Sequence, residues 1–288
     1  MAALDELIAL LDIEALEVNL FRGVSPEADQ QRVFGGQVAA QALVAAGRTV
    51  EPTRAVHSLH SYFLRPGDTS VPIIFQVDRP RDGRSFTTRR VNAVQHGKVI
   101  FNLAASFQIV EPGPEHVDEM PMVPDPEELP SWPERLASYA DRLGPETMAW
   151  LVRERPIDSR PTQTPAWLDH TAREPQQDVW IRANGTLPDD PLLHACVVAY
   201  ASDLTLLDTA MLPHAVRLAE SEFQIASLDH AMWFHRPFRA DEWLLYHQTS
   251  PFAGGARGLA EGAIYTRAGR RAVTVIQEGL IRPVVPGS

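Results

Sequence analysis

The chain contains the same pattern twice, and an internal repeat constrains a fold more strongly than any local propensity. The run YFLRP at residues 62–66 corresponds to WFHRP at residues 233–237, and each run lies inside a strand-like segment. About 20 residues later, each copy has two long strand-like runs separated by a short turn, HGK at 96–98 and AGR at 268–270. A short glycine-containing turn between two such runs predicts a β-hairpin in each copy.

Each copy also places one strongly apolar helix before its strands. The first helix is predicted over residues 35–46 and ends at Gly47, where a C-terminal cap is expected. The second is predicted from Leu192 to Tyr200 and is apolar on every side except at His194, which indicates burial. One buried helix followed by antiparallel strands is an α+β pattern. Because the pattern occurs twice, we expect two curved sheets, each wrapped around a central helix and joined edge to edge.

The segment between the two copies differs from both in composition. Residues 111–178 hold 12 of the 24 prolines and carry 15 acidic side chains against 6 arginines, which is −9 of the formal net charge of −11. This composition predicts a solvated connector with short helices around residues 132–139 and 146–153. The sequence therefore predicts a first unit at residues 1–110, a connector at 111–178 and a second unit at 179–288.

The overall composition excludes several classes of protein. A net charge of −11 argues against a nucleic-acid partner, because duplex binding needs a basic face that neutralises phosphates. A single cysteine, Cys196, excludes an internal disulfide and a multi-cysteine metal site, and it fits a reducing compartment. No run approaches the roughly 18 apolar residues that span a bilayer, and the N-terminus lacks the basic region of a signal peptide. We expect a cytoplasmic globular protein without a membrane span.

Familiar catalytic motifs are missing from the sequence. It contains no nucleophile elbow, no phosphate-binding glycine loop, no dinucleotide fingerprint and no zinc-protease motif. The ten histidines lack the spacing of metal ligands, and Cys196 lies in an apolar run that favours core packing over nucleophilic attack. We therefore expect no cofactor and no metal ion.

A basic island at residues 79–84, RPRDGR, is followed by Arg89 and Arg90. One interpretation is an exposed turn with a solvated face. The other is an anion site for the phosphates of a ligand, which arginine recognises well.

Three polar residues occupy positions where apolar residues would pack. Asp203 ends the apolar stretch of the second helix, Gln277 is in phase with apolar residues on a strand, and Ser227 precedes the second WF run. Taken singly, each has a structural interpretation: a solvated or capping carboxylate, a cross-strand amide and a structural hydroxyl. Together they form a set that could hold one water, with the carboxylate accepting its proton and the other two orienting it. Such a set can hydrolyse an activated acyl group, for which a thioester is a natural target.

The sequence resembles the type II acyl-CoA thioesterases over nearly its whole length. The resemblance is carried by six runs in the family's order: FGGQVAAQA (34–42), HSLHSYFLRPG (57–67), SDL (202–204), LDHAMWFHRPF (228–238), EWLLY (242–246) and QEG (277–279). It implies a double hotdog fold, two hotdog units in one chain, and hydrolysis of fatty acyl-CoA to free fatty acid and CoA without a cofactor.

The resemblance also implies a catalytic set, which falls on Asp203, Ser227 and Gln277. The aspartate and the glutamine match the family pattern, whereas Ser227 stands where threonine is usual, so the hydroxyl is kept and the stiffening methyl is lost. The first half shows no copy of the full set. We therefore expect one active site per chain, in a homo-oligomer (a dimer or a tetramer) whose contacts include the first half.

Two rival functions stay open at this point. A hotdog-fold enoyl-CoA hydratase would want an aspartate–histidine pair, whereas the residue five positions after Asp203 is Asp208. A non-catalytic acyl-CoA binding protein would hold the same ligand without turnover. If Asp203 is not the base, the next candidate is Asp229, which is close to Ser227 in sequence.

Overall fold

The computed structural model describes residues 2–26, 32–165, 168, 171–214 and 223–284. Its helices are α1 (Ala3–Leu11), α2 (Gly35–Gly47), α3 (Trp132–Ala137), α4 (Ala140–Leu143), α5 (Pro145–Leu151) and α6 (Pro191–Ser202), with the 3₁₀ helices η1 (Pro126–Glu128) and η2 (Leu207–His214). Its strands are β1 (Glu14–Glu17), β2 (Leu20–Gly23), β3 (Ala55–Phe63), β4 (Ile73–Asp82), β5 (Phe86–Gln95), β6 (Lys98–Gln108), β7 (Ile157–Pro161), β8 (Gln176–Ala183), β9 (Phe223–Ser227), β10 (Asp229–Phe234), β11 (Leu244–Gly254), β12 (Arg257–Thr266) and β13 (Arg271–Pro283).

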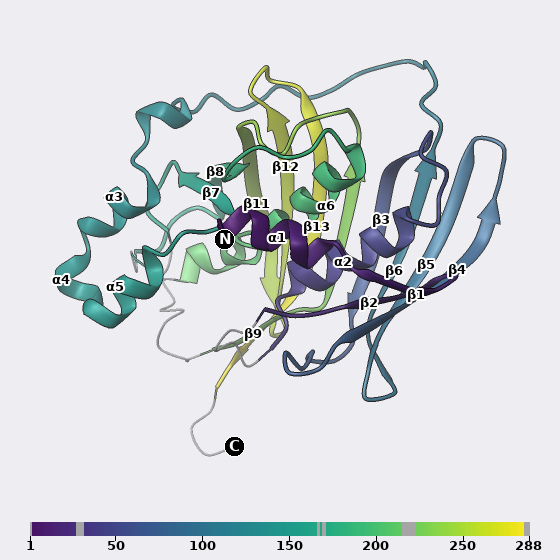
Figure 1. Ribbon diagram of the computed structural model, residues 1–288. Coiled ribbons are helices and arrows are strands. Elements are labelled where there is room, and N and C mark those ends of the chain that lie inside the picture. The colour runs from purple at the N-terminus through teal and green to yellow at the C-terminus, as the bar shows by residue number, and fades with distance from the viewer. Residues whose placement is uncertain (1, 27–31, 166–167, 169–170, 215–222, 285–288) are drawn as a thin grey trace.

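The strands form one antiparallel sheet in which the two halves have the same order. The sheet runs β1-β2-β4-β5-β6-β3-β10-β13-β12-β11-β8-β7, and β9 pairs with β13. The series β2, α2, β3, β4, β5, β6 of the first half is repeated as β8, α6, β10, β11, β12, β13. In Figure 1, α2 and α6 lie together against the sheet, with the strands of the first half on one side and those of the second half on the other. The repeat confirms the α+β class and the double hotdog fold.

The two halves join where β3 pairs with β10. These strands are antiparallel, with Tyr62 opposite Asp229 and Ser58 opposite Trp233. They are the strands that carry the repeated aromatic runs of the sequence, so equivalent edges of the two units meet at the junction.

The predicted hairpins are present in both halves. The β5–β6 turn contains Gly97 with φ of 68°, and the β12–β13 turn contains Gly269 with φ of 78°. Both glycines adopt the left-handed conformation that glycine reaches without steric cost. The position of each turn sets the register of the long strands that follow it.

The two central helices are buried and run in opposite directions. Every residue of α2 from Gly36 to Ala46 is buried, and Cys196 lies in the buried part of α6. Gly36 near the start of α2 lies against the carbonyl oxygen of Tyr200, while Gly47 at the end of α2 lies against Leu192. The start of α2 therefore meets the end of α6.

The connector is more structured than its composition predicts. Helices α3 and α5 confirm the predicted short helices, and the connector also supplies β7, which pairs with β8 at the edge of the sheet. Met120, Val123 and Leu129 pack against a cluster that contains Trp180 and Trp243. Figure 1 shows the connector crossing from the first half to α3–α5 beside the second half. The connector therefore covers apolar surface of the second half.

One segment, Pro191–His214, is long and apolar enough to cross a membrane by length and composition alone, and 72% of its most apolar window is buried inside the fold. Such burial is typical of the core helix of a folded domain. The segment consists of α6 and η2, which pack on the second half of the sheet.

The close contact of α2 with α6 predicts a difference between two glycines of the same helix. A Cβ atom at Gly36 would lie 2.4 Å from the backbone oxygen of Tyr200, whereas one at Gly47 would meet only the side chain of Leu192, at 2.4 Å. We expect Gly36→Ala to lower the free energy of unfolding by about 1–3 kcal/mol, because two backbones must separate. Gly47→Ala is expected to stay within about 1 kcal/mol of wild type, because a leucine side chain can rotate and alanine favours the helix.

Urea denaturation of the two variants checks this difference. Equal losses of stability would show that the two ends of α2 pack against α6 with the same tolerance, contrary to the structure.

Candidate active site

Asp203 lies where the second central helix ends. It is the C-terminal capping residue of α6, with φ of −89° and ψ of 0°, and it is half-buried. Its backbone N–H donates to the carbonyl of Ala201. The carboxylate of Asp203 points toward the start of α2. Its Oδ2 lies so close to Gly35 that a Cβ atom at that position would be only 2.6 Å away.

The structure brings the three predicted site residues into direct contact. The amide nitrogen Nε2 of Gln277 donates to Oδ1 of Asp203 at 2.6 Å and to Oγ of Ser227 at 2.8 Å. The Ser227 hydroxyl donates to the same Asp203 oxygen at 3.3 Å. Gln277 is fully buried on β13, and Ser227 ends β9, which pairs with β13 so that Ser227 lies opposite Gly279. An acid, a hydroxyl and an amide thus share one small volume.

The first half contributes the start of α2 to this site. The capping position of α2 is Phe34, whose side chain cannot cap the helix, so the first N–H groups lack the usual side-chain acceptor. The N–H of Gly36 donates to the Asp203 carboxylate instead. Only glycine fits at position 35, because a Cβ atom there would collide with Asp203. The contact of this glycine pair with Asp203 was not predicted from the sequence, although an uncapped Gly-Gly at the start of a buried helix is a readable signal.

Opposite helix ends act on the Asp203 carboxylate. The start of α2 carries a partial positive charge that favours the ionised form, and the end of α6 carries a partial negative charge that disfavours it. Burial raises the pKa of Asp203 to about 6, although hydrogen bonds from Gln277, Gly36 and Ser227 oppose the shift. Burial, together with the nearby Asp203, also raises the pKa of Asp208 to about 7. Asp203 is therefore a carboxylate that can both take up and release a proton near neutral pH.

The remaining hydrogen-bonding capacity of Gln277 lies in its amide oxygen. Nε2 serves two acceptors, while Oε1 is buried and has no partner among the described residues. A buried acceptor without a partner is costly, and such atoms mark positions where a ligand group or a water can donate.

The corresponding place in the first half is closed. Ala105 on β6 occupies the position of Gln277 on β13, and its neighbour on β5 is Arg89, where the second half has Ala260. Arg89 is buried, and its guanidinium donates to Thr49, to Asp82 and to the carbonyls of residues 49, 81 and 88. The start of α6 is capped by Asp190, which accepts from two backbone N–H groups. The corresponding place, where the strands of the first half meet the capped start of α6, therefore lacks the acid, the amide and the uncapped helix start of the site at Asp203.

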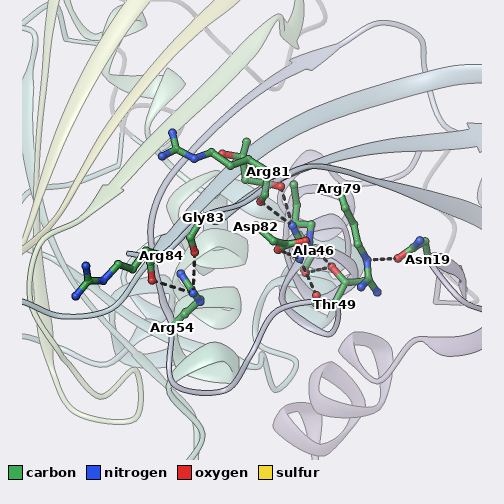
Figure 2. Close-up of polar contacts among 11 residues, drawn as sticks. Asn19, Ala46, Thr49, Arg54, Arg79, Arg81, Asp82, Gly83 and Arg84 are labelled. Carbon is green, nitrogen blue, oxygen red and sulfur yellow. Dashed lines mark hydrogen bonds and ion pairs between the residues drawn. The ribbon is translucent and has the colours of Figure 1, made fainter. Parts of the chain in front are cut away.

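The basic island of the sequence surrounds this closed place. In Figure 2, Arg54 donates to the carbonyls of Gly83 and Arg84, and Arg79 donates to Asn19. The guanidinium of Arg81 lies beside Gly83. The island lies beside the end of α2, whereas Asp203 lies beside its start, and a helix of 13 residues is about 20 Å long. The structure therefore places these arginines away from the Asp203 site, and it gives Arg89 a structural role.

Two other residues weighed in the sequence analysis have different surroundings. The carboxylate of Asp229 accepts from the backbone N–H of Glu278, and Cys196 is buried, which raises the pKa of its thiol. Among the residues that the structure describes, no group of three or more histidine, cysteine, aspartate or glutamate side chains could hold a metal ion.

The raised pKa of Asp203 predicts how stability depends on pH. A folded-state pKa of about 6, against an ordinary value of 3.8, means that the folded chain binds this proton more tightly than the unfolded chain. The stabilisation of the folded state by this bound proton is therefore fully present below pH 4 and is lost as the pH rises through 6. We expect Asp203→Asn to raise the free energy of unfolding by about 2 kcal/mol at pH 8 and to have little effect at pH 4. Urea unfolding at the two pH values measures this, and a gain that is the same at both would contradict a raised pKa.

Comparisons with known proteins identify relatives of both halves. A family model described as "Acyl-CoA thioesterase N-terminal domain" matches residues 24–108, and one described as "Acyl-CoA thioesterase" matches residues 151–280. Acyl-coenzyme A thioesterase 8 of Rattus norvegicus is 45% identical, over 95% of this chain and 88% of that protein. Acyl-CoA thioesterase 2 of Haemophilus influenzae is 39% identical, over 97% of this chain and 98% of that protein.

A solved structure supports the same assignment. The crystal structure of an acyl-CoA thioesterase II from Mycobacterium marinum is 48% identical in sequence, with a TM-score of 0.79 over 96% of this chain and 98% of that one. Matches to both halves, in order and over nearly the whole length, show that the chain belongs to the acyl-CoA thioesterase family and is a thioester hydrolase that acts on acyl-CoA.

Proposed function

We propose that the chain hydrolyses fatty acyl-CoA to free fatty acid and CoA with one water molecule activated by Asp203 and oriented by Ser227 and Gln277. The observation that carries the proposal is the contact of Gln277 Nε2 with both Asp203 and Ser227 at hydrogen-bond distance. An acid, a hydroxyl and an amide fixed against one another can hold a water at a defined angle to a bound carbonyl.

The reaction follows from the roles of these groups. Asp203 takes a proton from the water as its oxygen attacks the thioester carbonyl carbon. Negative charge then develops on the carbonyl oxygen, and the partial positive charge at the start of α2 stabilises it. The C–S bond breaks, and the CoA thiolate receives the proton that Asp203 accepted. The products are the fatty acid and CoA, and the carboxylate is restored.

The environment of Asp203 suits a general base. A base works best when its pKa is close to the working pH, because it must be ionised and must still attract a proton. Burial raises the pKa of Asp203 to about 6, which meets both requirements. The hydrogen bonds from Gln277, Ser227 and Gly36 keep the carboxylate ionised enough to act at neutral pH.

The rival functions have less support. A hydratase would pair the aspartate with a histidine, whereas the described residues that donate to Asp203 are an amide, a hydroxyl and a backbone N–H. A binding protein without turnover does not need a carboxyl group whose pKa is close to neutral beside an uncapped helix start. We favour hydrolysis over both.

The closed place at Arg89 supports one active site per chain. We also propose that residues 1–110 and 179–288 act as two units, with residues 111–178 as the connector, and that the active-site acid and amide come from the second.

An unpaired, buried Cys196 and the acidic composition fit a cytoplasmic location, which we propose for the chain.

A set of substitutions tests the catalytic roles. Asp203→Asn keeps the shape and removes the base, so kcat is expected to fall by roughly 10²–10⁴. Gln277→Ala is expected to cost less than Asp203→Asn, and Ser227→Ala is expected to lose a water contact. Ser227→Thr restores the residue usual in the family and is expected to keep most activity. KM is expected to change little, because the acyl chain and CoA are held elsewhere.

The assay follows thiol release from a panel of saturated and enoyl acyl-CoAs, together with loss of the enoyl absorbance. Thiol release alone supports hydrolysis, loss of enoyl absorbance supports a hydratase, and binding with neither signal supports a binding protein. Normal turnover in folded Asp203→Asn protein would show that another residue is the base.

We also propose that the chain forms a homo-oligomer, a dimer or a tetramer. Tyr62 on β3 is 58% exposed beside the junction, and next to it His60 and Trp233 pack edge to face with ring centroids 5.1 Å apart. A partly exposed aromatic surface at the junction favours self-association. Light scattering at micromolar concentration is expected to give at least twice the 31.9 kDa of one chain, and a monodisperse monomer would contradict the proposal.

A further inference from the structure

A buried histidine beside the site has no role in the mechanism above. His230 lies on β10, is 1% exposed, and its ring nitrogen Nε2 is 2.9 Å from Oγ of Ser202. Ser202 is the last residue of α6 and is fully buried, and Asp203 follows it directly. The histidine therefore joins the sheet at the junction of the two halves to the helix turn that presents the proposed base.

The hydrogen bonds around Ser202 define the form of the histidine. The Ser202 hydroxyl donates to the carbonyl of Ala199 at 3.0 Å, so its single proton is used there. Nε2 of His230 must therefore carry the proton that it shares with Ser202. Nδ1 is left as a buried acceptor without a partner among the described residues. Burial lowers the pKa of His230 to about 4, so the ring stays neutral in the range where Asp203 ionises.

A second strand holds the same residue. The hydroxyl of Tyr246 on β11 donates to the carbonyl oxygen of Ser202 at 3.1 Å. The tyrosine ring lies where a side chain at position 262 would be, because a Cβ atom at Gly262 would lie 2.3 Å from it. Ser202 is thus tied to β10 through its hydroxyl and to β11 through its carbonyl.

The backbone of His230 is fixed as well. Its carbonyl accepts from the hydroxyl of Ser61 on β3 at 2.8 Å, and His230 lies opposite Ser61 in the β3–β10 pair. The chain of contacts from β3 through His230 to Ser202 is therefore continuous and buried. It leads from the first half to the residue next to Asp203.

We propose that His230 is a positioning residue for hydrolysis, which acts through Ser202 to hold the last turn of α6 so that the Asp203 carboxylate meets Gln277 and Ser227. The inference rests on the proposed role of Asp203 as the base. Loss of the His230 hydrogen bond removes the contact of the Ser202 hydroxyl with β10 and leaves the Tyr246 contact alone to hold this residue to the sheet. The turn can then rotate, and the carboxylate moves relative to the amide. A displacement of about 1 Å at a reacting group can cost about 10²-fold in rate.

The test compares His230, which contacts the end of α6, with a matched histidine near the start of the same helix. His194 near the start of α6 is also buried, and its Nδ1 accepts one hydrogen bond, from the backbone N–H of Ala240. His194→Leu and His230→Leu each remove one buried imidazole and one hydrogen bond. We expect both to lower the melting temperature, while only His230→Leu lowers kcat, by about 10–100-fold with KM nearly unchanged.

Two further variants separate positioning from packing. His230→Gln can place an amide N–H near the position of Nε2, so it is expected to recover most of the kcat that His230→Leu loses. Ser202→Ala removes only a hydroxyl and is expected to lower kcat in the same direction. If the two residues act as one unit, adding His230→Leu to Ser202→Ala changes kcat by less than about threefold more.

The outcomes decide the inference. If His230→Leu keeps the kcat of His194→Leu, or if its effect multiplies with that of Ser202→Ala, positioning through Ser202 is wrong. If the leucine variants do not fold, Ser202→Ala and His230→Gln give the answer, because an unchanged kcat in Ser202→Ala overturns the proposal. Asp203→Asn is measured in parallel. If that variant is active, Asp203 is not the base and the proposed function is wrong. If it is inactive while Ser202→Ala has normal kcat, only the role of His230 is wrong.

Discussion

The site depends on one contact, the antiparallel packing of α2 against α6 with their backbones touching. Gly36 meets the carbonyl oxygen of Tyr200 so closely that no side chain fits between them. This approach brings the uncapped, positive start of α2 to the carboxylate at the end of α6. The two helices belong to different halves of the chain, so neither half alone contains the arrangement. The β3–β10 pair fixes the relative position of the halves and thereby the distance between the two helix ends.

The repeat produces two equivalent places, each where the start of one central helix meets the end of the other. Different residues at these two places give them different chemistry. At one end the strands and helices supply Asp203 and Gln277, and at the other they supply Ala105 and the fully hydrogen-bonded Arg89. The buried guanidinium fills the space, and Asp190 satisfies the helix start. The first half is thus a structural partner whose Gly36 backbone N–H donates to the acid of the second half.

Much of this could be predicted from the sequence, because the repeat, the hairpin glycines and the apolar helices report local geometry directly. Gln277 could be identified because a polar amide is unexpected on the apolar face of a strand, in phase with valines. Other features could not be read locally. The strand β7, the burial of Arg89 and the tie between His230 and Ser202 depend on which segments the tertiary fold brings together. From sequence, an arginine that follows a basic turn is expected to be solvated, whereas in the structure Arg89 donates five hydrogen bonds to four residues.

The central claim is that Asp203 activates water and does not itself attack the thioester. A single turnover in H₂¹⁸O, with enzyme in excess over acyl-CoA, separates the two. If water attacks, the fatty acid released in this first turnover carries one ¹⁸O atom and Asp203 stays unlabelled. If Asp203 attacks and water then opens the resulting anhydride at the aspartyl carbon, the fatty acid takes an unlabelled oxygen from the carboxylate and ¹⁸O appears in Asp203. Mass spectrometry of the fatty acid and of the peptide that contains Asp203 measures both; the account predicts the first result, and the second would contradict it.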